Sequence, residues 1–260
     1  MHGWTGKILK VNLTDQTTET LRPESDLYLR NVGGKGLAGA LLLEHFCRNW
    51  DDPEMPLAFM TGPLNNTAAP TSGRMTVMSR SPLTGTVCDT SVGGRMGTIL
   101  KRAGYDGIIM TGKSAAWCGL NISETGVTFH QAEQLTGLSV SEINARLSTE
   151  PEMQQGSHAV VGPAAENRVR YAAIVLDGHY FAGRGGLGLV MAEKKLKFIS
   201  VNGKQKTSVA DPAELKAAQE EIYRLVSASP VLTGELGISN YGTGALYDLM
   251  RSRRMMPTNN

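Results

Sequence analysis

Residues 182–188 (AGRGGLG) have the composition of an anion-binding loop, because four of them are glycine and one is arginine. Glycine permits positive φ angles and lets a ligand approach the backbone closely. An apolar segment of helical character follows at once, and the free N–H groups and positive dipole at a helix start attract anions. Arg184 adds a planar set of donors suited to phosphate. The stretch predicts a site for a phosphate-bearing cofactor; the alternative is a tight turn packed in the core.

Standard nucleotide-binding motifs match this loop poorly. A dinucleotide fold needs an acidic residue about 20 positions after its glycines, and Lys204 and Lys206 occupy that region instead. No GxxxxGK[ST] sequence is present, which excludes a P-loop.

Three further residues are candidates for chemistry at a site. Arg74, which follows Thr71-Ser72-Gly73, is either an anion ligand or an ordinary surface arginine. His179, close to the glycine-rich loop, is the one histidine for which we expect a functional role. Asp89 is expected in a loop, either as a carboxylate near the site or as a turn residue.

The composition is that of a globular protein. The 260 residues are 41% hydrophobic and 19% charged, with a net charge of +2, so nothing indicates a nucleic-acid surface. No signal core and no apolar run of about 18 residues is present. Cys47, Cys88 and Cys118 are far apart and lack zinc spacing, so we expect reduced, mostly buried thiols. We therefore expect a cytoplasmic protein without a membrane span.

An internal repeat organises the chain. Residues 97–113 and 188–204 align without a gap, and each copy runs from a glycine-rich loop through a short helix to a strand ending in Gly-Lys. Upstream, the Gly-Pro pair at Gly62 recurs at Gly162. The repeat predicts an α+β fold of two related halves, each of which presents a glycine-rich loop and an arginine to a shared cleft. Chance similarity of two helix-strand units is the alternative.

The character of the chain changes at Asp211-Pro212. Asp211 can cap a helix, proline suits the first helical position, and residues 213–226 have the apolar period of an amphipathic helix. We expect one domain over residues 1–210 and the start of a helical domain over residues 211–260.

Motifs along nearly the whole chain resemble the aldehyde ferredoxin oxidoreductase family. They occur in the family's order, and their sequences here are GWTGKILKVNL (residues 3–13), GGKGLA (33–38), TGPL (61–64), APTSGR (69–74), SPLTG (81–85), AGYD (103–106), GPAAEN (162–167) and AGRGGLG (182–188).

The resemblance implies a tungsten or molybdenum bis-pterin enzyme that oxidises aldehydes to carboxylic acids. Electrons would pass through a [4Fe-4S] cluster to ferredoxin or another iron-sulfur carrier. The N-terminal domain would be a duplicated α+β base that carries the two pterins, and a magnesium ion would bridge their phosphates.

By motif, seven residues of this chain correspond to cofactor contacts of the family. The carbonyl groups of Ser91 and Phe181 correspond to the magnesium ligands. Arg74 corresponds to the arginine between pterin and cluster. The other pterin contacts are Gly93, Tyr180, Gly183 and Arg184. The family has asparagine in place of Ser91 and arginine in place of Tyr180, and the lost arginine weakens the expected phosphate clamp.

The family's cluster cysteines, in a CxxCxxxC run, should follow residues 257–259, but the sequence given ends at Asn260. We expect the C-terminal helical domains to be missing partners of this chain and the chain to be inactive without them. We also expect residues 213–260 to be self-associated, as in a homo-oligomer, or mobile when alone. The alternative function is a non-enzymatic interaction or scaffold module.

Overall fold

The computed structural model describes residues 1–255. Residues 1–67 and 71–210 form one compact unit, and residues 68–70 with the chain beyond Ala210 form another. Among the described residues, no helix is long and apolar enough to cross a membrane. Residues 256–260, part of the expected helical domain, lie outside the described residues.

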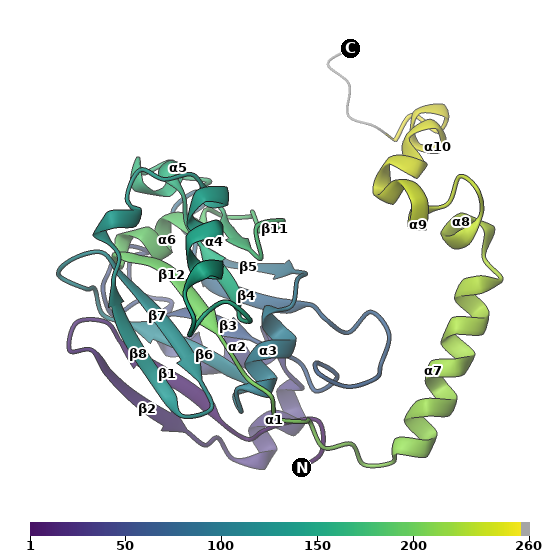
Figure 1. Ribbon diagram of the computed structural model, residues 1–260, viewed down its shortest axis with the longest axis horizontal. Coiled ribbons are helices and arrows are strands. Elements are labelled where there is room, and N and C mark those ends of the chain that lie inside the picture. Colours follow the sequence, from purple (N-terminus) through teal and green to yellow (C-terminus); the bar gives the residue numbers. More distant parts are fainter. Residues whose placement is uncertain (256–260) are drawn as a thin grey trace. The chain divides into compact units, whose positions relative to one another are not determined.

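The first unit contains two mixed six-stranded sheets (Figure 1). In spatial order, the first sheet consists of β2 (Thr17–Leu21), β1 (Ile8–Asn12), β6 (Gly107–Thr111), β3 (Leu57–Met60), β4 (Met75–Arg80) and β5 (Val87–Val92). The second consists of β8 (Gly126–Gln131), β7 (Cys118–Ser123), β12 (Leu196–Val201), β9 (Ser157–Val160), β10 (Ile174–Leu176) and β11 (Tyr180–Ala182).

The two sheets have the same topology. In each, the first strand pairs antiparallel with its hairpin partner and parallel with the last strand of its half, β1 with β6 and β7 with β12. The remaining neighbours are antiparallel. Helices α3 (Met96–Arg102) and α6 (Leu187–Glu193) precede these last strands, and aligning Gly97 with Gly188 superposes them end to end. The predicted duplication and α+β fold are confirmed, and the repeat extends over all six strands of each sheet.

One hydrophobic core fills the space between the sheets. Leu9 and Val11 of β1 point into this core, whereas Ile8 points to the outer face, as the alternation of a strand requires. Both α3 and α6 contribute to the core, and each packs on the sheet of the other half. Helix α3 contacts β9 and β12, and α6 contacts β4. The halves are therefore interlocked.

Helices cover the outer face of each sheet. The first sheet carries α1 (Ser25–Asn31), α2 (Gly34–Leu42) and the 3-10 helix Leu43–His45. The second carries α4 (Val140–Thr149), which begins with a capping box of Ser139 and Glu142, and the 3-10 helix Glu133–Leu135. Helix α5 (Pro163–Glu166) follows the second Gly-Pro pair.

The sequence does not indicate two of the strands, β5 and β11. Strand β5 is polar over residues 88–91 (CDTS), and β11 has only three residues, so neither has a clear apolar alternation. Asp89, expected in a loop, lies within β5, so that expectation is wrong. The three cysteines are free, as expected, but only Cys118 is buried.

The second unit is helical where it is described. Helix α7 (Pro212–Ser227) begins at Asp211, whose carboxylate accepts hydrogen bonds from Ala213 N and Glu214 N, both at 2.9 Å. Shorter helices follow, α8 (Pro230–Thr233), α9 (Ile238–Tyr241), the 3-10 helix Gly242–Leu246 and α10 (Tyr247–Ser252).

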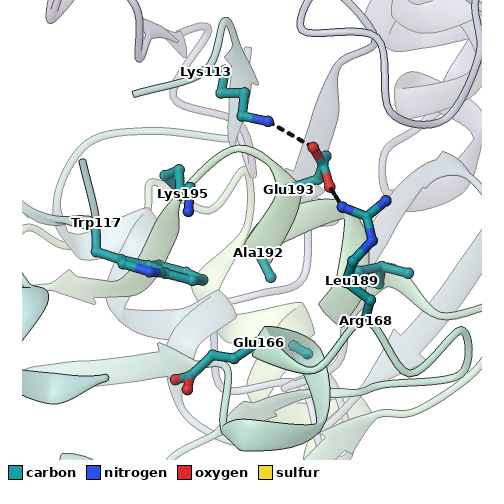
Figure 2. A pocket seen from close by; sticks show the side chains of 9 residues that line it. Lys113, Trp117, Glu166, Arg168, Leu189, Ala192, Glu193 and Lys195 are labelled. Carbon is teal, nitrogen blue, oxygen red and sulfur yellow. Dashed lines mark hydrogen bonds and ion pairs between the residues drawn. The ribbon is translucent and has the colours of Figure 1, made fainter. Parts of the chain in front are cut away.

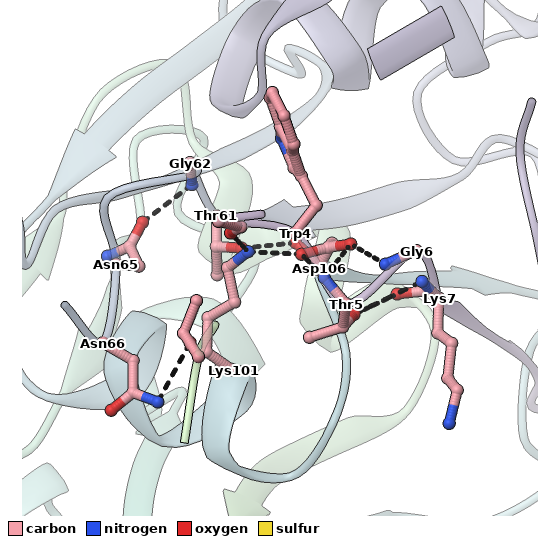
Figure 3. A network of polar contacts seen from close by, with 12 residues as sticks. Trp4, Thr5, Gly6, Lys7, Thr61, Gly62, Asn65, Asn66, Lys101 and Asp106 are labelled. Atoms are coloured by element: carbon pink, nitrogen blue, oxygen red, sulfur yellow. Dashed lines mark hydrogen bonds and ion pairs between the residues drawn. The ribbon is translucent and has the colours of Figure 1, made fainter. Parts of the chain in front are cut away.

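A buried ion pair holds the N-terminal segment to the first half (Figure 3). Lys101 of α3 and Asp106, directly before β6, are both almost fully buried and in contact. The Asp106 carboxylate also accepts from Thr5 N at 3.0 Å and Gly6 N at 2.8 Å, and Lys101 Nζ donates to Gly3 O at 2.7 Å. Burial lowers the pKa of Lys101, and the adjacent Asp106 opposes that shift.

Replacing Asp106 by asparagine leaves the Lys101 charge buried without its partner, which costs about 3–5 kcal/mol. We expect Asp106→Asn to lower the free energy of unfolding by that amount in urea titrations followed by circular dichroism. The exposed pair Lys10–Glu19 is the control, because Glu19→Gln should cost less than about 1 kcal/mol. Equal effects of the two variants would contradict this role of Asp106.

Candidate cofactor-binding surface

The two sheets meet edge to edge at the residues selected from the sequence. Strand β5 is the last strand of the first sheet, β11 is the last strand of the second, and the two are in contact. An edge strand has unpaired N–H and C=O groups along one side. This part of the surface therefore offers main-chain donors and acceptors from both halves.

The glycine-rich loop of the first half is held by the β10–β11 hairpin of the second. Arg95 N donates to Asp177 Oδ2 at 2.7 Å. A Cβ atom on Gly93 would lie 3.1 Å from the Tyr180 ring, and one on Gly94 would lie 2.9 Å from Asp177 Oδ2. Gly94 also has a φ of +96°, so both its neighbours and its conformation favour glycine.

The glycine-rich loop of the second half is held by the β4–β5 hairpin of the first. Ser81 Oγ donates to Gly185 O at 2.6 Å. A Cβ atom on Gly185 would lie 2.0 Å from Cys88 Sγ, and one on Gly186 would lie 1.9 Å from Arg170 O. Each glycine-rich loop is thus clamped by the hairpin of the opposite half.

Asn65 fixes the segment that ends at Arg74. Its Oδ1 accepts from Gly62 N at 2.7 Å, and its Nδ2 donates to Ser72 O at 2.8 Å and to Arg74 O at 3.2 Å. The Arg74 side chain reaches β5, where Nη1 donates to Ser91 O at 3.2 Å. Asn65 therefore positions the arginine that the sequence indicated.

The structure gathers the predicted residues at this junction. Six of them are exposed, namely Arg74, Ser91, Tyr180, Phe181, Gly183 and Arg184, and Gly93 is half-buried. Direct contacts join Arg74 to Ser91 and Gly93 to Tyr180. Tyr180 and Phe181 leave 46% and 63% of their surface exposed, which is unusual for two adjacent aromatic residues and marks an open surface.

Asp177, not His179, makes the structural contacts of the β10–β11 turn. His179 is exposed, and in the described part of the chain its hydrogen bond is made by the backbone, from N to Leu176 O at 3.1 Å. Asp177 Oδ1 accepts from Ser157 Oγ at 2.6 Å, in addition to the bond from Arg95 N. The signal for Asp177 in the sequence was the Asp177-Gly178 pair, which is typical of a turn, and the structure gives Asp177 a positive φ of 49°.

Residues 1–255 contain no cluster of three or more His, Cys, Asp or Glu side chains that could hold a metal ion. Besides side-chain oxygens such as those of Asp89 and Ser91 in β5, the junction has the backbone carbonyls of two edge strands. Carbonyl oxygens are ligands that Mg²⁺ and other hard cations accept, together with phosphate oxygens of a bound group.

A pocket of 200 Å³ lies at the far end of α6 from its glycine-rich loop (Figure 2). Glu193 bridges Lys113 and Arg168 there, at 2.6 Å to each, and Lys195 lies 5.0 Å from the Trp117 ring centre. Burial would raise the pKa of Glu193, but the hydrogen bonds and charges of the two cations outweigh it and lower that pKa. Glu193 is paired with two cations, so its carboxylate is occupied by a structural ion network.

The chain is similar throughout its length to curated tungsten enzymes. It is 38% identical over 262 residues to the tungsten-containing aldehyde ferredoxin oxidoreductase of Pyrococcus abyssi, which covers 100% of this chain and 43% of the relative. It is 28% identical to the WOR-like subunit of an aliphatic sulfonate oxidoreductase of Pyrococcus furiosus, covering 94% of this chain and 42% of that one. The chain thus spans less than half the length of these relatives.

A solved structure has the same fold. The active site complex BamBC of benzoyl coenzyme A reductase aligns with a TM-score of 0.84 and 32% sequence identity, over 87% of this chain and 35% of that one. This chain therefore belongs to the class of proteins with this duplicated α+β fold. The family model of the aldehyde ferredoxin oxidoreductase N-terminal domain matches residues 8–203, and the chain belongs to that family.

We expect Asp177→Asn to loosen the junction. Asparagine tolerates the left-handed conformation of this position, so the variant changes only the acceptors, and losing a hydrogen bond to a charged acceptor costs up to about 3 kcal/mol. Hydrogen exchange of the Arg95 amide should become faster. Asp15→Asn is the control, because Asp15 makes an exposed contact to Asn12. An unchanged exchange rate at Arg95 would show that Asp177 does not clamp the loop.

Lys194 gives a testable pH dependence. Burial lowers its pKa from 10.5 to about 8, although Glu54 and Asp52 oppose the shift. Between those two pKa values the unfolded chain holds the proton more tightly than the folded one, so the free energy of unfolding should rise with pH. The rise is on the order of 3 kcal/mol.

The Lys194→Met variant should lack this rise. Urea unfolding of both proteins across that pH window measures it, because the difference between them isolates Lys194 from the other titrating groups. Parallel pH curves for the two proteins would contradict the assignment.

Proposed function

We propose that residues 1–210 form the cofactor-binding base of a tungsten or molybdenum bis-pterin oxidoreductase that converts aldehydes to carboxylic acids. The observation that carries the proposal is the junction itself. Two glycine-rich loops, each clamped by the opposite half, lie beside exposed arginines and two sheet edges. This arrangement suits a large ligand with phosphate groups at two places.

In this proposal the residues bind and orient the cofactor. Arg74 and Arg184 hold anionic oxygens, since guanidinium groups match phosphate geometry. Gly93 and Gly183 let the cofactor approach the backbone. The carbonyl oxygens of Ser91 and Phe181 would hold a magnesium ion, which would neutralise phosphate charge of the bound cofactor.

The residues of the junction fit a metal-pterin with phosphate groups, but Ser91 and Tyr180 each change how it would be held. Ser91 O already accepts from Arg74 Nη1, so a magnesium ion there needs phosphate charge to offset the nearby guanidinium. Tyr180, where the resemblance has an arginine, packs its ring on Gly93 and Gly94. It therefore offers an aromatic surface rather than a charge, and Arg184 carries more of the phosphate binding.

When bound, the metal-pterin supplies the two-electron oxidation. The remaining parts of the reaction are proposed to come from protein outside this chain. These parts are a [4Fe-4S] cluster, the continuation of the helical domains whose first part is residues 211–260 of this chain, and ferredoxin or another iron-sulfur carrier. We also propose that the protein forms homo-oligomers and is located in the cytoplasm.

This region does not select the substrate in our proposal. Relatives that share it are named for aldehydes, for aliphatic sulfonates and for benzoyl coenzyme A. Because these relatives are named for such different substrates, the region that they share is better explained by the binding of a common cofactor. Substrate selection then falls to the protein outside the base.

The proposal is tested by binding of the cofactor itself. Metal-pterin released from a tungsten enzyme of the family is mixed with the chain and Mg²⁺ and separated by gel filtration, and tungsten and pterin fluorescence are measured in the protein peak. We expect both to co-elute with the chain and to be lost when Mg²⁺ is removed. Arg184→Gln should weaken binding about tenfold or more, because a charge-assisted hydrogen bond is lost.

Arg22→Gln is the matched control, because Arg22 is exposed and follows β2, at the opposite edge of the first sheet from β5. No retention of tungsten or pterin by the folded chain would reject the proposed binding and support the scaffold function instead. The purified chain alone should not reduce viologen dyes with aldehydes. Aldehyde-dependent reduction by it would refute the division of function between this base and the rest of the enzyme.

A further inference from the structure

The two halves differ on their outer faces, despite their common topology. Helices α1 and α2 fill the outer face of the first sheet, where Tyr28, Leu37 and Leu42 are fully buried. In the second half that face is covered by α4, which Figure 1 labels, by the 3-10 helix Glu133–Leu135 and by Met153 of the turn after α4. A pocket of 340 Å³ remains between them, β8 and β12.

The floor of this pocket is apolar. It is formed by side chains that are at most 4% exposed, namely Leu135, Leu147, Met153 and Phe198. The Phe198 ring lies against β7, where a Cβ atom on Gly119 would be 2.0 Å from it. Such a floor favours an aliphatic or aromatic ligand body, because burying apolar surface provides the driving force.

One polar atom at the pocket lacks a partner. His130 Nε2 is buried and makes no hydrogen bond to any described residue, and its ring lies 6.2 Å from that of Phe198. A buried nitrogen of this kind costs free energy unless something pairs with it. A ligand oxygen at the pocket would supply that partner.

One cationic side chain, Arg146, lies on the rim of the pocket. The exposed Arg146 guanidinium donates from Nη1 to Gln134 O at 3.2 Å, and its charge also acts on Glu142, one turn earlier in α4, whose pKa is lowered mainly by hydrogen bonds from Ser139 and in part by Arg146. Glu150 also lies on the rim, so a second negative charge on the ligand would be repelled.

We propose that this pocket binds a small monocarboxylic acid with an aliphatic or aromatic body. The body lies on the Phe198 and Leu147 floor. The carboxylate accepts from His130, in the tautomer that carries its proton on Nε2, and from Arg146. The inference does not depend on the metal-pterin assignment, because the pocket belongs to the outer face of the second sheet and the pterin contacts belong to its edge.

The test uses the full 260-residue chain with benzoate and hexanoate as probes. The imidazole nitrogens of His130 are observed by long-range ¹H–¹⁵N NMR during titration, together with the backbone amides. We expect saturable shifts of His130 Nε2 and of amides in α4 and β12. The corresponding neutral amides, benzamide and hexanamide, should bind more weakly, and the dicarboxylate phthalate should not compete.

Arg146→Gln should weaken benzoate binding about tenfold or more through the lost charge-assisted bond. His130→Leu should also weaken it, while thermal stability is kept or raised, because the leucine leaves no unpaired nitrogen. Arg22→Gln serves as control and should bind normally. Glu150→Gln should bind more tightly, since it removes a repelling charge.

Three results would overturn the inference. One is the absence of any His130 shift up to the solubility limit of both probes, which would leave an ordered water as the partner of Nε2. Another is equal affinity of the wild type and the folded Arg146→Gln variant. The third is a set of shifts located away from α4 and β12.

Discussion

The structure depends on the way in which the two halves hold each other. Helix α3 contacts β9 and β12 of the second sheet, and α6 contacts β4 of the first sheet in addition to β10 and β12 of its own. The same exchange occurs at the surface, where Asp177 binds the first glycine-rich loop and Ser81 binds the second. Each loop also has contacts within its own half, such as Gly188 N with Ala172 O at 3.0 Å, but the bonds from Asp177 and Ser81 come from the other half. The observed junction therefore requires both halves to be folded.

The junction uses backbone atoms where many sites use side chains. Free sheet edges are usually covered, because their unpaired groups invite other chains. Here β5 and β11 place two such edges together, and glycines replace the side chains that would block access. A site of this kind tolerates side-chain change at positions such as Ser91. It is sensitive instead to any Cβ atom on Gly185 or Gly186, where backbone and side-chain atoms leave no room.

The two halves share one strand topology, but their buried charged residues differ. Under the repeat, Asp106 and Lys197 occupy equivalent positions. Asp106 pairs with Lys101, whereas Lys197 pairs with Glu166. The charge at that position is reversed, and a different partner neutralises it. Both charged side chains are buried, and a buried charge requires a partner of opposite sign. The two halves satisfy this constraint independently, so the outer faces and ends of each half can differ while the shared junction is kept.

The sequence by itself determined the duplication, the main buried strands and the residues of the junction. Gapless alignment of the two helix-strand units and the family motifs were enough for that, since glycine loops and apolar periods are local signals. It did not predict β5 and β11, nor the roles of Asn65, Ser81 and Asp177. Edge strands are defined by pairing and not by apolar alternation, and these three side chains act on segments distant in the sequence. Which loop each hairpin holds, and the pocket beside His130, depend on packing between elements that only the tertiary structure brings together.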